Sequence, residues 1–167
     1  MKEEEKARAE QKVRLLQFVQ KIPVFSGLSS YKAKIILSLC TKKVVQEGEI
    51  LCRQGEESNA MYILLSGKLG VIIKDSAPVA TIHPVSSIGE MGVFTGEKRT
   101  ATVQAMEKSN FLVLNKNDIE RMIEKDSQFG LNIMRKVIHI LSERICDDNV
   151  KICKFQSSVI SKENSKN

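Results

Sequence analysis

Apolar positions change their period twice along the chain. Residues 2–20 combine high helix propensity with apolar residues at 13–19, and after residue 115 apolar positions recur every three or four residues, as on one face of a helix. Between about residues 43 and 114 they form short runs separated by glycine-bearing turns, which is typical of β-strands. The pattern therefore predicts helices, then a β-rich domain, then helices.

Seven apolar runs in the middle of the chain are expected to be strands. The segments between them have turn compositions about ten residues apart, the rhythm of an antiparallel sandwich or barrel. Gly48, Gly55 and Gly67 are expected to supply tight bends there. The expected strands are 44–45, 50–52, 61–65, 69–73, 79–82, 102–103 and 111–114.

Helix signals bracket this region. The first helix should end before Ile22-Pro23, because a residue before proline avoids helical geometry, and Ser29 or Ser30 should cap the second. After residue 115 a stripe of apolar residues could pack on the strands or on a second copy of the chain. That stripe comprises Ile133, Val137, Ile140, Leu141 and Ile145.

Domain boundaries follow from these patterns. Residues 1–20 are expected to form a helical arm and residues 21–150 one domain that includes the C-terminal helix. Residues 151–167 form a polar tail whose last part, from Ser157, is rich in serine, lysine and asparagine, and we expect the tail to be disordered.

Composition narrows the class of protein. The 167 residues carry a net charge of +6 and contain 42% hydrophobic residues, ordinary values for a globular domain. No apolar run approaches the roughly 20 residues of a membrane span, and the charged N-terminus lacks a secretory apolar region. We therefore expect a cytoplasmic protein without a membrane segment. The basic charge suits anionic partners, but no aromatic-interleaved basic stripe indicates nucleic-acid binding.

Residues suited to metal binding or catalysis are few. The four cysteines contain no C-x-x-C pair and only two histidines accompany them, so reduced, packed thiols are expected and no metal site. No nucleophile–base pair or paired carboxylates can be argued, so the chain is not expected to be an enzyme.

The segment 88–103, IGEMGVFTGEKRTATV, breaks the strand rhythm and carries the candidate chemistry. Gly89 and Gly92 let the backbone approach a ligand closely, and a short helical turn over 91–94 would direct free amides at a phosphate. Arg99 could bind the same phosphate through its planar, permanently charged guanidinium. Glu90 would repel a phosphate but suits a sugar hydroxyl, so the predicted ligand presents a phosphate beside a ribose. Thr100 and Thr102 add hydroxyls to the same rim.

This segment resembles the phosphate-binding cassette of the cyclic nucleotide-binding domain, the family of the bacterial catabolite activator protein, kinase regulatory subunits and gated channels. The resemblance extends over about residues 20–148. Further matching motifs are IPVFSGL at 22–28, GEILCRQGE at 48–56, MYILLSG at 61–67 and LSERI at 141–145. It implies an α+β fold, an eight-stranded antiparallel β-barrel or jelly roll flanked by N-terminal helices and a long C-terminal helix.

The resemblance also implies roles for single residues. Glu90 would bind the ribose 2′-hydroxyl and Arg99 the cyclic phosphate, while Arg144 on the C-terminal helix would cap the purine. The remaining implied ligand contacts are backbone amides from Gly89, Met91 and Gly92, closure of the pocket by Thr100 and Ala101, and an apolar wall from Val71 and Ile73. Two departures from the family pattern are Val85-Ser86-Ser87, in place of a more usual Gly-Asp step, and Lys98, where many members carry proline.

The implied function is a regulatory domain that binds cyclic AMP or cyclic GMP and moves its C-terminal helix, with no further cofactor. Thr100 permits cyclic GMP without establishing it. Expected partners are a second copy through the C-terminal helix and an effector domain or protein in trans. Two alternatives stay open: an interaction scaffold that binds no nucleotide, and a truncated DNA-binding regulator. The latter is disfavoured because about twenty residues after Arg144 are too few for a helix-turn-helix domain.

Overall fold

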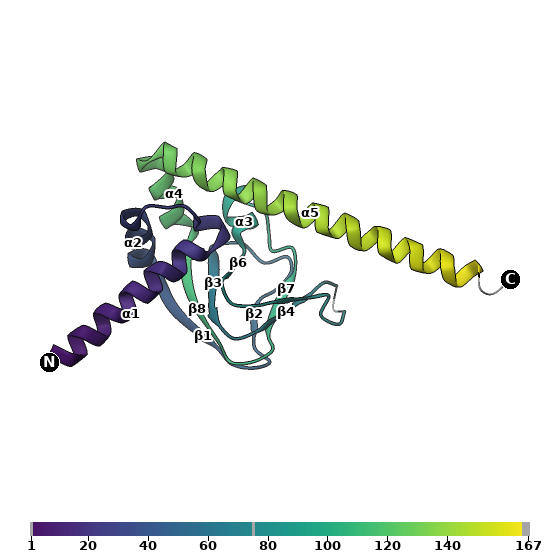
Figure 1. The fold of residues 1–167 in the computed structure, drawn as a ribbon, viewed down its shortest axis with the longest axis horizontal. Helices are drawn as coiled ribbons and strands as arrows, with labels where there is room; N and C mark the ends of the chain where they lie inside the picture. Colours follow the sequence, from purple (N-terminus) through teal and green to yellow (C-terminus); the bar gives the residue numbers. More distant parts are fainter. Residues whose placement is uncertain (1, 75, 165–167) are drawn as a thin grey trace.

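The computed structural model describes residues 2–74 and 76–164. Helices α1 (Lys2–Lys21) and α2 (Ser30–Leu39), separated by the short 3₁₀ helix η1 (Pro23–Phe25), precede the strands (Figure 1). Helix α3 (Glu90–Thr95) interrupts the strands, and α4 (Lys116–Lys125) and α5 (Ser127–Asn164) follow them. The strands are β1 (Thr41–Val45), β2 (Ile50–Cys52), β3 (Ala60–Ser66), β4 (Leu69–Ile72), β5 (Ala80–Ile82), β6 (Ser86–Ile88), β7 (Thr102–Ala105) and β8 (Ser109–Asn115).

The strands form two antiparallel sheets of four. One sheet has the order β1-β8-β3-β6 and the other the order β2-β7-β4-β5. The predicted eight-stranded jelly roll with flanking helices is thereby confirmed, with the strands in two packed sheets that are not closed into a barrel. The third and sixth strands pair through Tyr62 opposite Ile88, which places the start of α3 at the edge of the first sheet.

The two central strands of the first sheet, β3 and β8, are buried on both faces, whereas the edge strand β1 is mostly exposed. On β3, Met61 and Ile63 pack with the helices, whereas Leu64 packs between the two sheets, as strand alternation requires. On β8, Leu112 faces the helices and Phe111 faces the second sheet. Burial on both faces explains why residues 61–65 read as one uninterrupted apolar run rather than an alternating one.

The N-terminal helices meet the sheet where the sequence predicted their ends. Helix α1 stops before Ile22-Pro23, and Ile22 is fully buried in the helix-side core. Ser29 caps α2 by accepting a hydrogen bond from the Lys32 amide at 3.3 Å. These contacts fix the helical layer on the outer face of the first sheet.

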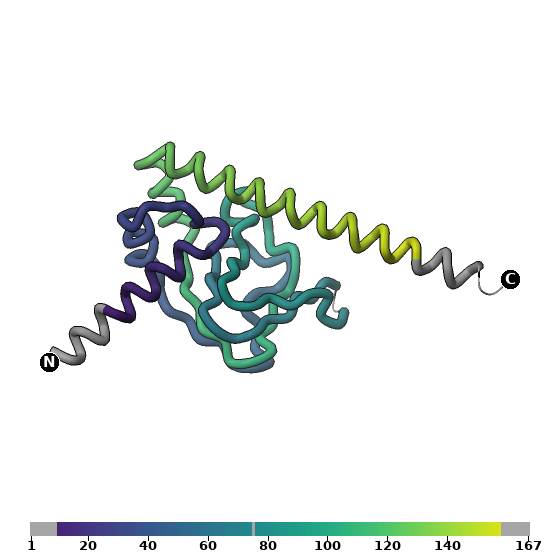
Figure 2. Tube along the Cα trace, in the orientation of Figure 1, coloured from purple at the N-terminus to yellow at the C-terminus, as the bar shows by residue number. Residues whose placement is uncertain are grey.

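Helix α5 corrects the prediction of a disordered tail over 151–167. The helix continues to Asn164 and extends well past the sheets (Figures 1 and 2), while residues 165–167 lie outside the described part. Apolar residues such as Ile152 and Phe155 continue the helical period into this segment, so its polar composition was misleading. Over residues 2–74 and 76–164, no helix combines the length and apolar character of a membrane span.

Two further differences concern the strands and the thiols. Strand β6 was missed because Ser86-Ser87 is polar, and the preceding Val85 adopts φ 69°, a left-handed conformation that β-branched residues rarely take.

All four cysteines are free, but only Cys52 is buried and Cys40 half-buried; Cys146 and Cys153 are exposed on α5. Burial raises the pKa of the Cys40 thiol to about 12, so this thiol stays protonated.

Candidate functional site

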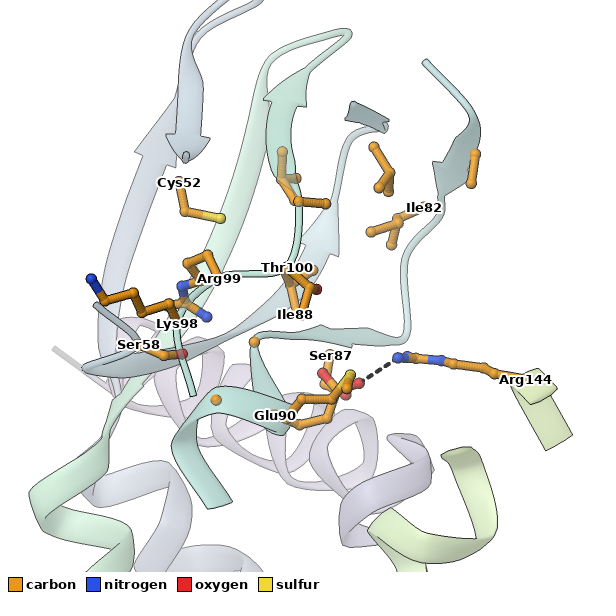
Figure 3. A pocket seen from close by; sticks show the side chains of 17 residues that line it. Cys52, Ser58, Ile82, Ser87, Ile88, Glu90, Lys98, Arg99, Thr100 and Arg144 are labelled. Carbon is orange, nitrogen blue, oxygen red and sulfur yellow. Dashed lines mark ion pairs between the residues drawn. The ribbon is translucent and has the colours of Figure 1, made fainter. Parts of the chain in front are cut away.

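A cavity of about 280 Å³ opens between the second sheet, the segment 87–103 and helix α5 (Figure 3). This volume is near the lower end of the range of small-ligand sites. One part of the wall is apolar and comes from the strands. The other part is polar and holds two charged side chains that are almost fully buried, Glu90 and Arg99.

Nine of the ten residues predicted to bind ligand line this cavity. The exception is Ile73, which lies beyond the end of β4 and is 41% exposed. Thr102 is also off the lining, and its hydroxyl accepts a hydrogen bond from the Gln54 amide. The nine are Val71, Gly89, Glu90, Met91, Gly92, Arg99, Thr100, Ala101 and Arg144.

The backbone of Arg99 is fixed by the turn that follows β2. Its amide donates to Glu56 O, and its carbonyl accepts from the Gly55 amide, both at 2.8 Å. The side chain then reaches into the fold, where Nη2 donates to Ala60 O at 2.6 Å and the guanidinium lies 5.3 Å from the Tyr62 ring centre. These contacts hold a side chain that is only 8% exposed.

The charge of Arg99 has no carboxylate partner among the described residues. Its Nη1 is buried without any hydrogen-bond partner there. Glu90, the acidic group predicted in the same segment, pairs with a different arginine. The segment therefore does not contain a simple surface ion pair between Glu90 and Arg99. A buried cation with a free donor creates a strong local preference for an anion.

Two glycines allow polar side chains to approach the backbone of the segment. Gly89 has φ 82° and sits against Arg99, so a Cβ there would collide with Nη1. Gly92 sits against Ser58 in the same way. Ser58 lines the cavity, is 5% exposed, and its hydroxyl has no partner in the described part of the chain.

Glu90 occupies the first position of α3 and is 2% exposed. Its Oε1 lies 2.7 Å from Nη1 of Arg144, which reaches across from α5 (Figure 3). The side chain of Arg144 is half-exposed and lines the cavity. In this structure the arginine predicted to cap a base is held by the carboxylate predicted to bind a sugar, so α5 and the segment 88–103 are joined by an ion pair.

Sequence reasoning missed several lining residues. The apolar ones lie on four different strands, and no local signal brings those strands together. Ser58 was read as part of a turn, and nothing in its neighbours indicates that its hydroxyl is buried. Among the apolar group, burial raises the pKa of the Cys52 thiol, an effect that the nearby charge of Arg99 partly offsets. The missed residues are Cys52, Ser58, Ala80, Ile82, Ser87, Ile88, Lys98 and Val103.

The arrangement offers separate positions for an anion, a hydroxyl group and an apolar group. Helix α3 has only six residues, so its dipole adds little, and the anion preference rests on Arg99. Within the described ranges no three His, Cys, Asp or Glu side chains gather where they could hold a metal. The site can accept an anionic group beside Arg99, a hydroxyl donor beside Glu90 and a flat apolar group against the strands.

Comparison with known proteins identifies the fold and the family. A model of the cyclic nucleotide-binding domain matches residues 42–126, just over half of the chain. This chain belongs to the cyclic nucleotide-binding domain family. The matched region contains the whole segment 88–103 and all the strands except the first residue of β1.

Relatives of this domain occur in larger proteins. A cAMP-dependent protein kinase regulatory subunit of Yarrowia lipolytica is 31% identical over 107 residues, which cover 64% of this chain and 28% of that protein. A cyclic nucleotide-gated potassium channel of Rhizobium etli is 27% identical over 139 residues, covering 80% and 37% respectively. This chain thus spans roughly a third of the length of these relatives.

A solved cyclic nucleotide-binding domain from Methylobacillus flagellatus has the same fold. Its structure superimposes with a TM-score of 0.71 at 20% identity, covering 83% of this chain and 80% of that one. At that identity the likeness establishes the fold and carries no statement about ligand.

Proposed function

We propose that this chain is a regulatory domain that binds a cyclic nucleotide, cyclic AMP or cyclic GMP, in the cavity beside segment 88–103. The observation that carries the proposal is the buried guanidinium of Arg99, whose Nη1 has no partner among the described residues. Burying a cation without a counter-charge is costly, and a phosphate of single negative charge would supply one. The proposed occupant needs no further cofactor.

The sugar and the base have matching positions in the cavity. Glu90 would accept a hydrogen bond from the ribose hydroxyl through the oxygen that Arg144 does not engage. The amides of Gly89, Met91 and Gly92 would surround the phosphate, and Thr100 and Ala101 would close its other side. Val71, together with Ile82 on the neighbouring strand, would form the apolar wall for the base.

Regulation would pass through α5. Because Arg144 joins this helix to Glu90, any shift of Glu90 toward a bound sugar changes a contact of the helix. A ligand alters the position of the helix only if it binds the two arrangements with different affinity. We infer that the ligand couples to α5 at this ion pair and that an effector, on the same polypeptide or in trans, senses the helix.

A second copy of the chain is the proposed partner for the outer face of α5. Leu131, Ile138, Ile145 and Ile152 recur every seven residues, with Met134 at the intervening position, and each is 42–63% exposed. A seven-residue apolar repeat with β-branched residues is typical of a two-stranded coiled coil. At roughly 100 Å² for each of these residues, two copies would bury about 1,000 Å², the size at which specific interfaces begin.

Calorimetric titration of the chain with cyclic AMP and with cyclic GMP tests the proposed ligand. The expected result is saturable binding of at least one of them in the micromolar range or tighter. Adenosine, which lacks the phosphate, serves as the control and should bind at least about 100-fold more weakly because it leaves Arg99 without an anion. Absence of binding to both cyclic nucleotides would contradict the proposal and favour a scaffold that binds no nucleotide.

A further inference from the structure

We propose that Ser58 is a ligand-binding residue whose hydroxyl donates a hydrogen bond to the phosphate that Arg99 binds. The inference rests on the proposed cyclic nucleotide function and adds a residue outside segment 88–103. Ser58 lies in the turn before β3, far from that segment in sequence, yet it lines the same cavity. Figure 3 shows both Ser58 and Arg99 among the residues that line the cavity.

The two unpartnered polar groups lie against neighbouring glycines. Nη1 of Arg99 sits against Gly89 and the hydroxyl of Ser58 sits against Gly92, three residues further along. Gly89 and Gly92 both line the cavity. A single small anion between these glycines would therefore lie beside both the guanidinium and the hydroxyl.

Burial makes the lack of a partner informative. Most buried polar side-chain atoms in proteins have a hydrogen-bond partner, so each exception requires an explanation. In the described part of the chain the only two such atoms are Ser58 Oγ and Arg99 Nη1, and both belong to this cavity. One tetrahedral anion with two exposed oxygens would satisfy both donors at once.

Replacing Ser58 should affect ligand binding and the stability of the ligand-free chain in different ways. A hydroxyl that is buried without a partner destabilises the ligand-free protein, so replacing the hydroxymethyl side chain with methyl in Ser58→Ala should leave the free energy of unfolding unchanged or raise it. The same replacement removes a hydrogen bond to a charged ligand, which weakens binding by roughly 10- to 100-fold. A residue that only supported the turn would show the opposite pattern.

The test compares Ser58→Ala with the wild-type chain in two measurements. Thermal unfolding without ligand should show an unchanged or higher midpoint, and calorimetric titration with the tighter-binding cyclic nucleotide should show at least a tenfold weaker Kd. Ser109→Ala is the matched control, because Ser109 is fully buried, lies off the cavity and donates to Glu107 O at 2.8 Å. That variant should lose stability and keep its affinity.

The two diastereomers of the cyclic phosphorothioate give a third readout that a packing defect does not change. Each replaces one exocyclic phosphate oxygen with sulfur, a weaker acceptor. If Ser58 donates to one of these oxygens, Ser58→Ala should change the ratio of the two Kd values at least fivefold. An unchanged ratio, or unchanged affinity for the parent nucleotide, overturns the role of Ser58 while the proposed function stands. Failure of the wild-type chain to bind overturns both.

Discussion

Arg144 and Glu90 form an ion pair with Nη1 and Oε1 2.7 Å apart, joining the C-terminal helix to segment 88–103, which carries the proposed phosphate-binding residues. The carboxylate is almost fully buried, whereas the guanidinium is half-exposed. Removing the arginine would leave a buried charge without a partner, which is usually more damaging than removing both members of a pair.

A double-mutant cycle measures this link. In chemical unfolding of the ligand-free chain, Arg144→Ala should destabilise the wild type by about 1–3 kcal/mol, and much less when Glu90 is already Gln. The control cycle uses Lys151→Ala and Asp148→Asn, a pair on the same helix at the same 2.7 Å with both side chains mostly exposed. It should show no coupling beyond error. Equal coupling in the two cycles would contradict a specific role for the Glu90–Arg144 pair.

The contacts of Asp126, directly before α5, predict that the stability of the folded chain depends on pH. Its carboxylate pairs with Lys32 Nζ at 2.7 Å and accepts a hydrogen bond from the Phe129 amide at 2.9 Å. The bond to Lys32, followed by the bond from Phe129, lowers the pKa of Asp126 in the folded chain. The resulting stability is present above the unfolded pKa and is lost as the pH falls through the folded pKa.

Thermal unfolding of Asp126→Asn between pH 7 and pH 3 tests this expectation. Asparagine also caps helices, so the comparison isolates the charge. The wild-type midpoint should exceed that of the variant at pH 6–7, and the difference should shrink below about pH 4. Lys32→Ala should reproduce the effect. A difference that stays constant over the whole range would show that the carboxylate charge contributes nothing.

Self-association through α5 can be tested with two variants at repeat positions and one control variant. Ile145→Lys and Ile152→Lys place a charge at seven-residue repeat positions, whereas Val150→Lys places it at an equally exposed position, 52%, on another face of the helix. Sedimentation equilibrium should show a dimer for the wild type and for Val150→Lys, and a weakened dimer for the other two. A wild-type monomer at tens of micromolar, or equal effects of all three variants, would exclude this interface.

The sequence predicts an element of this fold well where the residues that determine it are close together in the chain. Glycine turns and proline at residue 23 act within a few residues, so the ends of the N-terminal helices and seven strands were predicted. Strand β6 lacks apolar side chains at Ser86-Ser87, and its pairing with β3 supplies what local propensity does not. The prediction of a disordered C-terminal tail was wrong because it relied on polar composition and overlooked a helical period that continues past residue 145.

The residues of the candidate site were likewise predicted where they lie close in sequence and missed where they meet only in the fold. Glu90 and Arg99 stand within ten residues of each other in a distinctive segment, so their types and spacing indicate a phosphate and a sugar. The partner of Glu90, the unpartnered hydroxyl of Ser58 and the exclusion of Ile73 from the cavity all depend on chain segments that meet only in the fold. No local pattern contains that information.

The central claim is that the buried charge of Arg99 binds a cyclic phosphate, and calorimetric titration of Arg99→Ala tests it most directly. Arg53→Ala is the matched control, since Arg53 lies in the adjacent turn, is mostly exposed and is off the cavity. Circular dichroism should first show that both variants are folded. The account predicts that Arg99→Ala weakens cyclic nucleotide binding at least about 100-fold and that Arg53→Ala leaves it unchanged. Binding of the wild-type chain that survives Arg99→Ala within twofold would contradict the account.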